Sequence, residues 1–344
     1  MLREVSVVIP TYNRSAMVCE AIASVIAQRC AGFELIVIDD GSTDGTADEL
    51  DRIARSVNAE NANRMEMRVL RTENRGVAAA RNTGVAMASA PLIAFLDSDD
   101  LWTPQKLEWQ LAFMRSHPGL AIAQTEEIWM RDGRRLNPGM RHRKRDGDIF
   151  RDSLRTCLIS PSAVIMRVAL FRELGGFDER MTAAEDYDLW LRIIAAGHEV
   201  GLLSEPMVTR RAGHVGQLSA TVAAIDRFRI LALLKLNAAD DLTTLNESRR
   251  SAVCVALAEK CAIYAQGLHR RGRESDAAAV AAIATRANNS WRESEANWVS
   301  DAIAAMLTII RQTTSGSAQR TCGIVNQDSG VTHGVRGERA RSDA

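Results

Sequence analysis

An apolar run of strand length that stops in three carboxylates constrains the fold of this chain most. Residues 92–96 read Leu-Ile-Ala-Phe-Leu after Pro91, and residues 97–100 read Asp-Ser-Asp-Asp. A short apolar run bounded by a breaker is typical of a strand buried on both faces of a parallel sheet. Ligands of such sheets bind outside the carboxyl ends of the strands, which is where these acids lie. Crowded carboxylates indicate a divalent-cation site or, since Asp and Ser also favour turns, a plain turn.

Segments with strand character and segments with helical periodicity alternate from residue 5 to about residue 118. This alternation is typical of βαβ units and a parallel sheet. Right-handed crossovers bring the carboxyl ends of such strands to one edge, so the polar clusters after them should converge, which favours a ligand site over a turn. The further strands are predicted at residues 5–9, 34–38 and 67–70, and the polar clusters are Thr11-Tyr12, Asp39-Asp40 and residues 97–100.

A second acidic cluster opens a helix in the less regular middle of the chain. Strands are predicted at residues 120–130 and 160–166, and Glu185-Asp186-Tyr187-Asp188 then begins a helix that Gly197 closes. Carboxylates suit the positive end of a helix dipole, so capping explains any single one of them. Three acids within four residues exceed what capping requires, which makes this helix start a candidate functional site.

The bulk composition restricts the class of protein and of partner. The 344 residues include 43 Lys and Arg against 43 Asp and Glu, so no net field favours nucleic acid or an anionic membrane. Six scattered cysteines without a C-x-x-C pair argue against zinc and disulfides and predict a reducing, cytoplasmic setting. A strand begins almost at once and no run of about 18 apolar residues occurs, so neither a signal peptide nor a membrane span is expected.

The texture changes after residue 218, where glycines become scarce and Ala, Leu and Arg dominate. We expect a helical region over 219–311 and a disordered tail over 312–344, which is rich in Gly, Ser, Thr and Arg. Apolar stripes predict that the helical region packs on the preceding domain or on a second subunit, as in a homodimer. The four helices are predicted at residues 219–237, 246–270, 273–288 and 290–311.

Six segments within residues 1–218 resemble, in order, the motifs of family-2 glycosyltransferases, whose catalytic domain has the GT-A fold. They are residues 8–14, 38–46, 74–76 with 80–84, 95–100, 175–178 and 185–190. The resemblance implies an α/β fold with a doubly wound, mostly parallel sheet flanked by helices. It divides this domain into a nucleotide-sugar-binding half, 1–118, and an acceptor and base half, 119–218.

The functional residues of the family carry over onto matching positions of this sequence. Asp186 matches the catalytic base, and Glu185 and Trp190 would lie on the sugar or acceptor side. A divalent cation, Mn²⁺ or Mg²⁺, would bind Asp99 and His214, although a surface-loop histidine is the alternative for the latter. The donor nucleotide would be held by Pro10, Thr11, Tyr12, Asp40, Asn74, Arg81, Asp97, Ser98 and Asp99.

The resemblance implies inverting transfer of a sugar from a nucleotide-sugar donor to an acceptor hydroxyl. A cation and an arginine stabilise the departing diphosphate, and a carboxylate takes the proton of the hydroxyl. One base on the face opposite the leaving group gives inversion in a single displacement. A UDP-hexose is the expected donor, and the expected acceptor is a glycan, a lipid-linked sugar or a small molecule, within cell-surface glycan or polysaccharide biosynthesis.

The basic segment 131–148 is predicted to form a flap on the acceptor side. It would meet a phosphate-bearing acceptor or a lipid head group, which leaves a peripheral contact with the inner face of a membrane open. A solvated loop is the alternative reading of the same residues.

Two rival functions stay open. A nucleotide-sugar-binding protein without turnover would lack the base, and a nucleotidyltransferase would carry a Gly-rich phosphate loop where this chain has residues 10–14. A dinucleotide dehydrogenase would need G-x-G-x-x-G at that place, and it is absent. Release of nucleoside diphosphate separates the enzyme from the binding protein.

Overall fold

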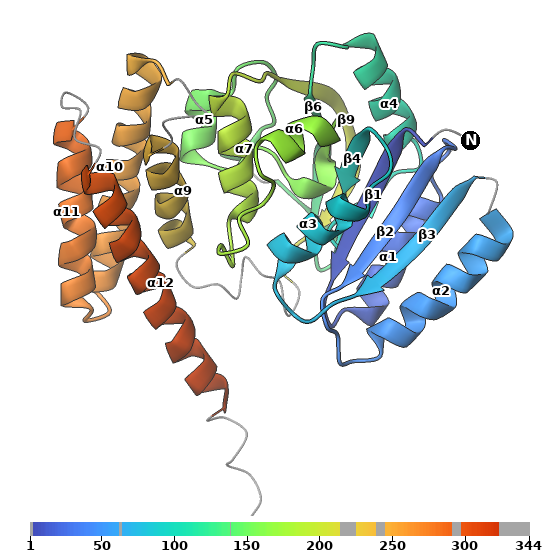
Figure 1. The fold of residues 1–344 in the computed structure, drawn as a ribbon, viewed down its shortest axis with the longest axis horizontal. Coiled ribbons are helices and arrows are strands. Elements are labelled where there is room, and N and C mark those ends of the chain that lie inside the picture. Colours follow the sequence, from blue (N-terminus) through green and yellow to red (C-terminus); the bar gives the residue numbers. More distant parts are fainter. Residues whose placement is uncertain are drawn as a thin grey trace, which may run out of the picture.

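A nine-stranded sheet forms the centre of the larger part of the molecule (Figure 1). The computed structural model describes residues 3–61, 64–137, 139–213, 225–238, 245–290 and 297–322. The strand order is β3-β2-β1-β4-β8-β6-β9-β5, and β7 pairs with β6 alone. The strands are β1 (Val5–Thr11), β2 (Phe33–Asp39), β3 (Met65–Arg71), β4 (Leu92–Phe95), β5 (Leu101–Trp102), β6 (Ile122–Arg131), β7 (Arg134–Leu136), β8 (Val164–Arg167) and β9 (Val200–Arg211).

The strands predicted for the first half of the domain are present and parallel. β1 pairs with β2 along its whole length and with β4 along its first part, and β2 pairs with β3. β1 also runs on to Thr11, past its predicted end at residue 9, and contains Pro10. Leu96 donates its N–H to the carbonyl of Val8, and strand alternation points Pro10 to the same side, beyond the end of β4. The proline therefore costs no ladder hydrogen bond.

The second half of the sheet has mixed strand directions. β8 is antiparallel to β4 and β6, β9 is parallel to β6, and β5 is antiparallel to β9. The sequence does not predict β9, because Gly201 and Pro206 interrupt its apolar pattern. The register between β6 and β9 shifts on both sides of Glu126, which stands opposite Pro206. Such irregularities accommodate a proline within a sheet and redirect the side chains beside it.

Helices cover both faces of the sheet, as expected for a doubly wound α/β fold. Val5, Val7 and Ile9 of β1 face the cluster formed with α1, α2 and α4, whereas Val8 faces the cluster that contains α3, α6 and α7. The helices of this part are α1 (Ser15–Ile26), α2 (Thr46–Asn61), α3 (Val77–Met87), α4 (Lys106–Ser116), α5 (Phe150–Arg155), α6 (Val168–Glu173) and α7 (Glu185–Ala195), with 3₁₀ turns η1 (Met140–His142) and η2 (Pro161–Ala163).

A second group of helices packs against this domain on the side of α5 and α7 (Figure 1). Phe228 and Leu231 of α9 belong to the same apolar cluster as Leu189 and Ile193 of α7, so the two parts share a core. α12 continues past residue 312, where a disordered tail is predicted, and residues 323–344 lie outside the described residues. The helices are α9 (Asp226–Ala238), α10 (Glu247–His269), α11 (Glu274–Ser290) and α12 (Asn297–Cys322).

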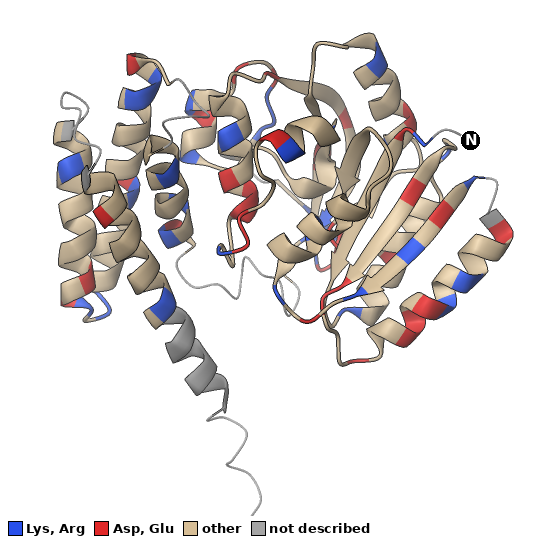
Figure 2. Cartoon of the chain, viewed as in Figure 1, with Lys and Arg blue, Asp and Glu red and all other residues tan. Residues whose placement is uncertain are grey.

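Charged side chains of both signs are interspersed over both parts (Figure 2), in keeping with the equal numbers of acids and bases. The five cysteines in the described ranges are free thiols. None of the helices within those ranges combines the length and the apolar composition that crossing a bilayer requires.

Candidate active site

Three carboxylates gather where β4 ends. Asp97, Asp99 and Asp100 each offer an oxygen atom, and these atoms lie within 4.8 Å of one another. Asp99 and Asp100 are buried. The donor set consists only of oxygens, which is the set that a hard divalent cation prefers.

Each of these acids has partners of its own. An oxygen of Asp97 lies 2.6 Å from the Arg81 guanidinium, and one of Asp99 lies 2.7 Å from Arg14. Asp100 accepts hydrogen bonds from the Ser162 hydroxyl at 2.7 Å and from the Arg211 backbone N–H at 3.1 Å. Asp100 thus ties the end of β4 to β9, while burial and its acidic neighbours raise its pKa well above the ordinary value.

Arg81 of α3 connects the strand-end acids to the first residue of α7. Its guanidinium is buried and lies 2.6 Å from both Asp97 and Glu185. Gly84 makes this reach possible, because a Cβ there would stand 2.4 Å from Val8 and push α3 away from β1. Burial opposes the charge of Arg81, but the two carboxylates outweigh it and raise its pKa. Asp97, Asp99 and Glu185 pair with Arg14 and Arg81, and the clustered oxygens of the three strand-end acids offer the ligand atoms that a divalent cation would need.

Asp40, predicted to hold the nucleobase, is occupied in folding the adjacent loop. Its two carboxylate oxygens accept the backbone N–H groups of Arg75 at 2.9 Å and Gly76 at 2.8 Å. These bonds fix the segment that leads into α3 and carries Asn74, whose side chain is exposed. The Thr11 hydroxyl at the end of β1 is buried without a hydrogen-bond partner among the described residues.

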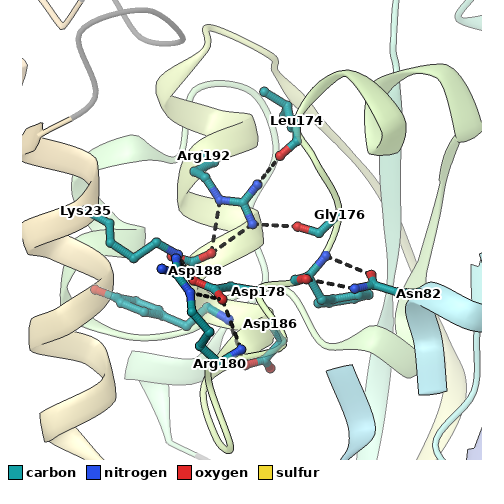
Figure 3. Close-up of polar contacts among 11 residues, drawn as sticks. Asn82, Leu174, Gly176, Asp178, Arg180, Asp186, Asp188, Arg192 and Lys235 are labelled. Carbon is teal, nitrogen blue, oxygen red and sulfur yellow. Dashed lines mark hydrogen bonds and ion pairs between the residues drawn. The ribbon is translucent and has the colours of Figure 1, made fainter. Parts of the chain in front are cut away.

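The three acids at the start of α7 have three different surroundings, and Figure 3 shows those of Asp186 and Asp188. Glu185 is buried against Arg81; burial raises its pKa and Arg81 opposes that rise. Asp188 is buried and forms ion pairs with Arg192 at 2.8 Å and with Lys235 of α9 at 2.6 Å. Both acidic neighbours of Asp186 are thus paired with cations.

Asp186 differs from its neighbours in being partly exposed and without a cationic partner in the described part of the chain. One of its oxygens accepts the backbone N–H of Tyr187 at 2.7 Å, and the other lies 3.7 Å from the sulfur of Cys157. Burial, with Asp186 nearby, raises the pKa of the Cys157 thiol and keeps it neutral. Asp186 is therefore the acid of this trio that can take a proton from a ligand.

A pocket opens beside Asp186. Its charged wall comes from Glu127 of β6, Lys144 of the segment after η1 and Arg210 of β9. Burial would raise the pKa of Glu127, but Lys144, Arg210 and hydrogen bonds outweigh it and lower that pKa to about 2. The lining residues are Glu127, Trp129, His142, Lys144, Cys157, Leu158, Ile159, Ser160, Asp186 and Arg210.

The structure does not bring every predicted residue to this site. Trp190 is 2% exposed and packs edge-to-face on Phe177 with ring centroids 6.1 Å apart, so it belongs to the core under α7 rather than to an acceptor surface. His214 lies outside the described residues. Ser98 is buried next to the acid cluster, and Tyr12 is 45% exposed on the loop after β1.

Sequence reasoning missed Glu127, Ser160 and Arg210 and placed Lys144 in a flap. Lys144 is instead buried. The one local signal is the pair Glu126-Glu127, because two acids inside a predicted strand are unusual for a segment that only fills a core. The other residues have no motif, and only the folded chain brings them together.

Comparisons with known proteins agree with this geometry. The sequence model described as Glycosyl transferase family 2 matches residues 6–175. The Escherichia coli enzyme UDP-Glc:alpha-D-GlcNAc-diphosphoundecaprenol beta-1,3-glucosyltransferase WfgD is 31% identical over 194 residues, which cover 55% of this chain and 69% of that protein. The chain belongs to glycosyltransferase family 2.

Two further comparisons define the extent of the likeness. An uncharacterized glycosyltransferase of Rickettsia felis is 34% identical over 210 residues, or 61% of this chain, and the match spans 33% of the relative's length. The crystal structure of S. aureus TarS 1–349 in complex with UDP-GlcNAc superposes with a TM-score of 0.60 at 19% identity, over 85% of this chain and 92% of that one. This likeness supports the GT-A type of fold.

Proposed function

We propose that this chain is an inverting glycosyltransferase that moves a hexose from a UDP-sugar to an acceptor hydroxyl. One observation carries the proposal: Arg81 joins a cation-suited acid cluster to Glu185, and the next residue, Asp186, is a carboxylate without a cation that borders a pocket. A leaving diphosphate needs a cation, which the acid cluster can hold, and an attacking hydroxyl needs a carboxylate that takes its proton. Inversion requires these two on opposite sides of the sugar.

The donor binds on the strand-end side in this proposal. WfgD is named for UDP-Glc and the TarS crystal contains UDP-GlcNAc, which supports UDP as the nucleotide. Residues 10–12 and Asp40 at the ends of β1 and β2, with Asn74 and Ser98, form the nucleotide side. Asp40 contributes by holding the loop before α3, where its carboxylate fixes two backbone N–H groups.

Mn²⁺ or Mg²⁺ would be held by Asp99 with Asp97 beside it, and His214 is proposed as a further ligand. The cation supplies positive charge to the diphosphate as its bond to the sugar breaks. Arg81 holds Asp97 in place through an ion pair. In the described ranges its buried guanidinium forms ion pairs with Asp97 and Glu185 alone.

Asp186 is the proposed general base. Its side chain lines the pocket and forms no ion pair in the described residues, and one of its oxygens contacts only the Cys157 thiol, a weak donor, so this oxygen can accept the acceptor hydroxyl. Removal of that proton during attack makes the hydroxyl a better nucleophile. A single displacement with the base opposite the leaving group inverts the anomeric carbon.

A lipid-linked sugar is the proposed acceptor, met at the cytoplasmic face of a membrane during assembly of a cell-surface glycan. The acceptor in the name of WfgD, a diphosphoundecaprenol-linked sugar, supports this class. Segment 131–148 contributes Lys144 to the pocket beside Asp186, which supports its placement on the acceptor side.

A donor panel tests the proposal. The protein with Mn²⁺ or Mg²⁺ is incubated with UDP-glucose, UDP-galactose, UDP-N-acetylglucosamine, GDP-mannose or dTDP-glucose and a mixture of lipid-diphosphate-linked sugars, and released nucleoside diphosphate is measured. We expect UDP from one UDP-hexose and a glycosylated lipid. UDP-sugar binding without release of UDP would identify a binding protein, and release from GDP or dTDP donors would replace the proposed nucleotide.

A further inference from the structure

The pocket beside Asp186 has a charged wall that the proposed donor chemistry does not use. Glu127, Lys144 and Arg210 come from three separate segments and meet only in the fold. Their state of hydrogen bonding shows what the wall can still bind.

Glu127 has both of its carboxylate oxygens occupied. One accepts the Trp129 indole N–H at 2.9 Å, and the other accepts the Ser160 hydroxyl at 2.7 Å. Its carboxylate is held ionised by the two neighbouring cations. Glu127 therefore serves as a fixed counter-charge and has little capacity left for a ligand.

Lys144 and Arg210, in contrast, retain unused donors. Lys144 Nζ lies 3.4 Å and an Arg210 guanidinium nitrogen 3.6 Å from the carboxylate of Glu127, and neither contact has hydrogen-bond geometry. The side chains of Lys144 and Arg210 form no hydrogen bond within the described residues. The Arg210 guanidinium is held over the Trp129 ring, 4.9 Å from its centroid. An ammonium with three N–H groups and a guanidinium with five thus share one carboxylate that is already occupied.

A ligand that complements this wall carries an oxyanion. Lys144 is buried and Arg210 is partly exposed to the pocket. A buried ammonium with unfilled donors is costly unless an acceptor satisfies it, and phosphate and carboxylate oxygens make the strongest such bonds. Asp186, in the same pocket, suits a hydroxyl instead. The pocket therefore has one place for a hydroxyl and another for an anion.

We propose that Lys144 and Arg210 bind an oxyanion carried by the acceptor, a phosphate, diphosphate or carboxylate group, while its hydroxyl meets Asp186. This inference rests on the proposed transferase function. Lys144 and Arg210 line the same pocket as Asp186, whereas the strand-end acids Asp97 and Asp99 pair with Arg81 and Arg14. Acceptors without an anionic group leave both cations unsatisfied and bind weakly.

Binding of small probes tests the inference without knowledge of the acceptor sugar. The full chain is saturated with UDP and Mn²⁺ so that the donor side is filled, and methyl diphosphate, methyl glucuronoside and methyl glucoside are titrated calorimetrically. We expect one of the two anionic probes to bind at least about tenfold more tightly than methyl glucoside, with an affinity that falls as salt rises. The anion that binds distinguishes a phosphate-bearing from a carboxylate-bearing acceptor.

Four variants assign that binding to the wall. Lys144→Met and Arg210→Met should each weaken the anionic probe about 10- to 100-fold. Glu127→Gln removes the competing counter-charge and should tighten it, a change of sign that mere loss of structure cannot produce. Arg143→Met is the matched control, because Arg143 is exposed, adjoins Lys144 and lies outside the pocket lining, so it should bind like the wild type.

Folding is controlled by the double variant Glu127→Gln with Lys144→Met, which leaves no extra unpaired carboxylate in the wall. It should melt no lower than Glu127→Gln alone, because the buried ammonium that lost its counter-charge is also removed, and it should still bind the probe more weakly than that single variant. Equal binding of all probes, or anion binding that UDP abolishes, would overturn the inference while UDP binding leaves the transferase proposal intact. A chain that does not bind UDP at all removes both proposals together.

Discussion

The proposed donor side and the proposed acceptor side of this site are built in opposite ways. Thr11 is the last residue of β1, Asp40 follows β2, and the acids at 97, 99 and 100 come shortly after β4, so each of these contributions is local in the sequence. The acceptor side draws Asp186 from a helix start and its charged wall from β6, β9 and the segment between them. Parallel strands concentrate short motifs at one edge, whereas the mixed half of the sheet assembles residues that are far apart.

The two sides also differ in charge. On the proposed donor side, three carboxylates, those of Asp97, Asp99 and Glu185, pair with Arg14 and Arg81, and the oxygens of Asp97, Asp99 and Asp100 gather within 4.8 Å of one another. On the acceptor side, the basic wall and its counter-charge leave Asp186 as the carboxylate without a cation. The first arrangement calls for a metal ion, and the second for a hydroxyl. The following experiments test that division, from the largest expected effect to the smallest.

Removal of the metal should abolish turnover, because the departing diphosphate would lose the cation that stabilises its charge. EDTA should stop UDP release, and Mn²⁺ or Mg²⁺ should restore it. Asp99→Ala should abolish the response to added metal. Full activity of Asp99→Ala in chelator would contradict a metal on the donor side.

Asp186→Asn should lower kcat by roughly 10²–10⁴-fold and leave the affinity for UDP near normal. Asparagine has nearly the same size and caps a helix nearly as well as aspartate, but it cannot take a proton. Steady-state kinetics and calorimetric UDP binding on the same preparation measure both quantities. Asp152→Asn, an exposed acid paired with Arg145, is the control and should keep its turnover. Loss of UDP binding in Asp186→Asn would instead place this residue on the donor side.

The donor side could be predicted from the sequence because its signals are local. An apolar run that ends in acids predicts both the strand β4 and the cluster of Asp97, Asp99 and Asp100. What the sequence could not predict is how these acids are used. Asp40 folds a loop and Asp100 ties β4 to β9, and both roles depend on backbone groups brought in from elsewhere.

The acceptor side was predictable only where a motif carries it, as at Asp186. The sequence does not predict β9, because Gly201 and Pro206 interrupt its apolar pattern. The position of Arg210 on that strand could therefore not be predicted either. Trp190 belongs to the same motif as these acids, but it lies on the face of α7 that is buried in the core, as Tyr187 does. Which helix face is buried depends on the packing of α9 and the sheet, which local spacing does not determine.

Glu127→Gln should change how the free energy of unfolding depends on pH. The folded-state pKa of Glu127 is about 2, below its ordinary value of 4.5, so its ionised form stabilises the fold above pH 4.5. That contribution, roughly 2–4 kcal/mol at pH 7, declines as pH falls below about 4.5 and is lost near pH 2. Urea titrations from pH 7 to pH 3 should show the wild type and Glu127→Gln converging. A difference that stays constant with pH would contradict an ionised Glu127.

The smallest effect concerns the way in which the helical region holds the acceptor side. Lys235 of α9 donates to Asp178 at 2.7 Å and to Asp188 at 2.6 Å, and Asp188 also contacts Arg192 (Figure 3). Asp178 lies in the segment that precedes α7, and Asp188 lies in the first turn of α7. Lys235 therefore connects both of them to α9. The Asn82 side chain of α3 forms two hydrogen bonds with the backbone of Phe177, next to Asp178. It donates to the Phe177 carbonyl at 2.8 Å and accepts the Phe177 N–H at 3.0 Å.

Lys235→Met should therefore lower kcat about 3- to 10-fold without changing the affinity for UDP, because α7 would lose one support and Asp186 its exact orientation. Lys235→Arg should recover most of that loss. Arg249→Met is the matched control: Arg249 of α10 also reaches the catalytic domain, through an ion pair with Asp148 at 2.7 Å, but away from the start of α7. Lys235→Met removes the ion pairs with Asp178 and Asp188, and Arg249→Met removes the one with Asp148, so a purely structural role predicts a lower melting temperature for both variants and an unchanged kcat. A fall in kcat confined to Lys235→Met, with donor affinity intact in both, would show that the helical region acts on the acceptor side alone.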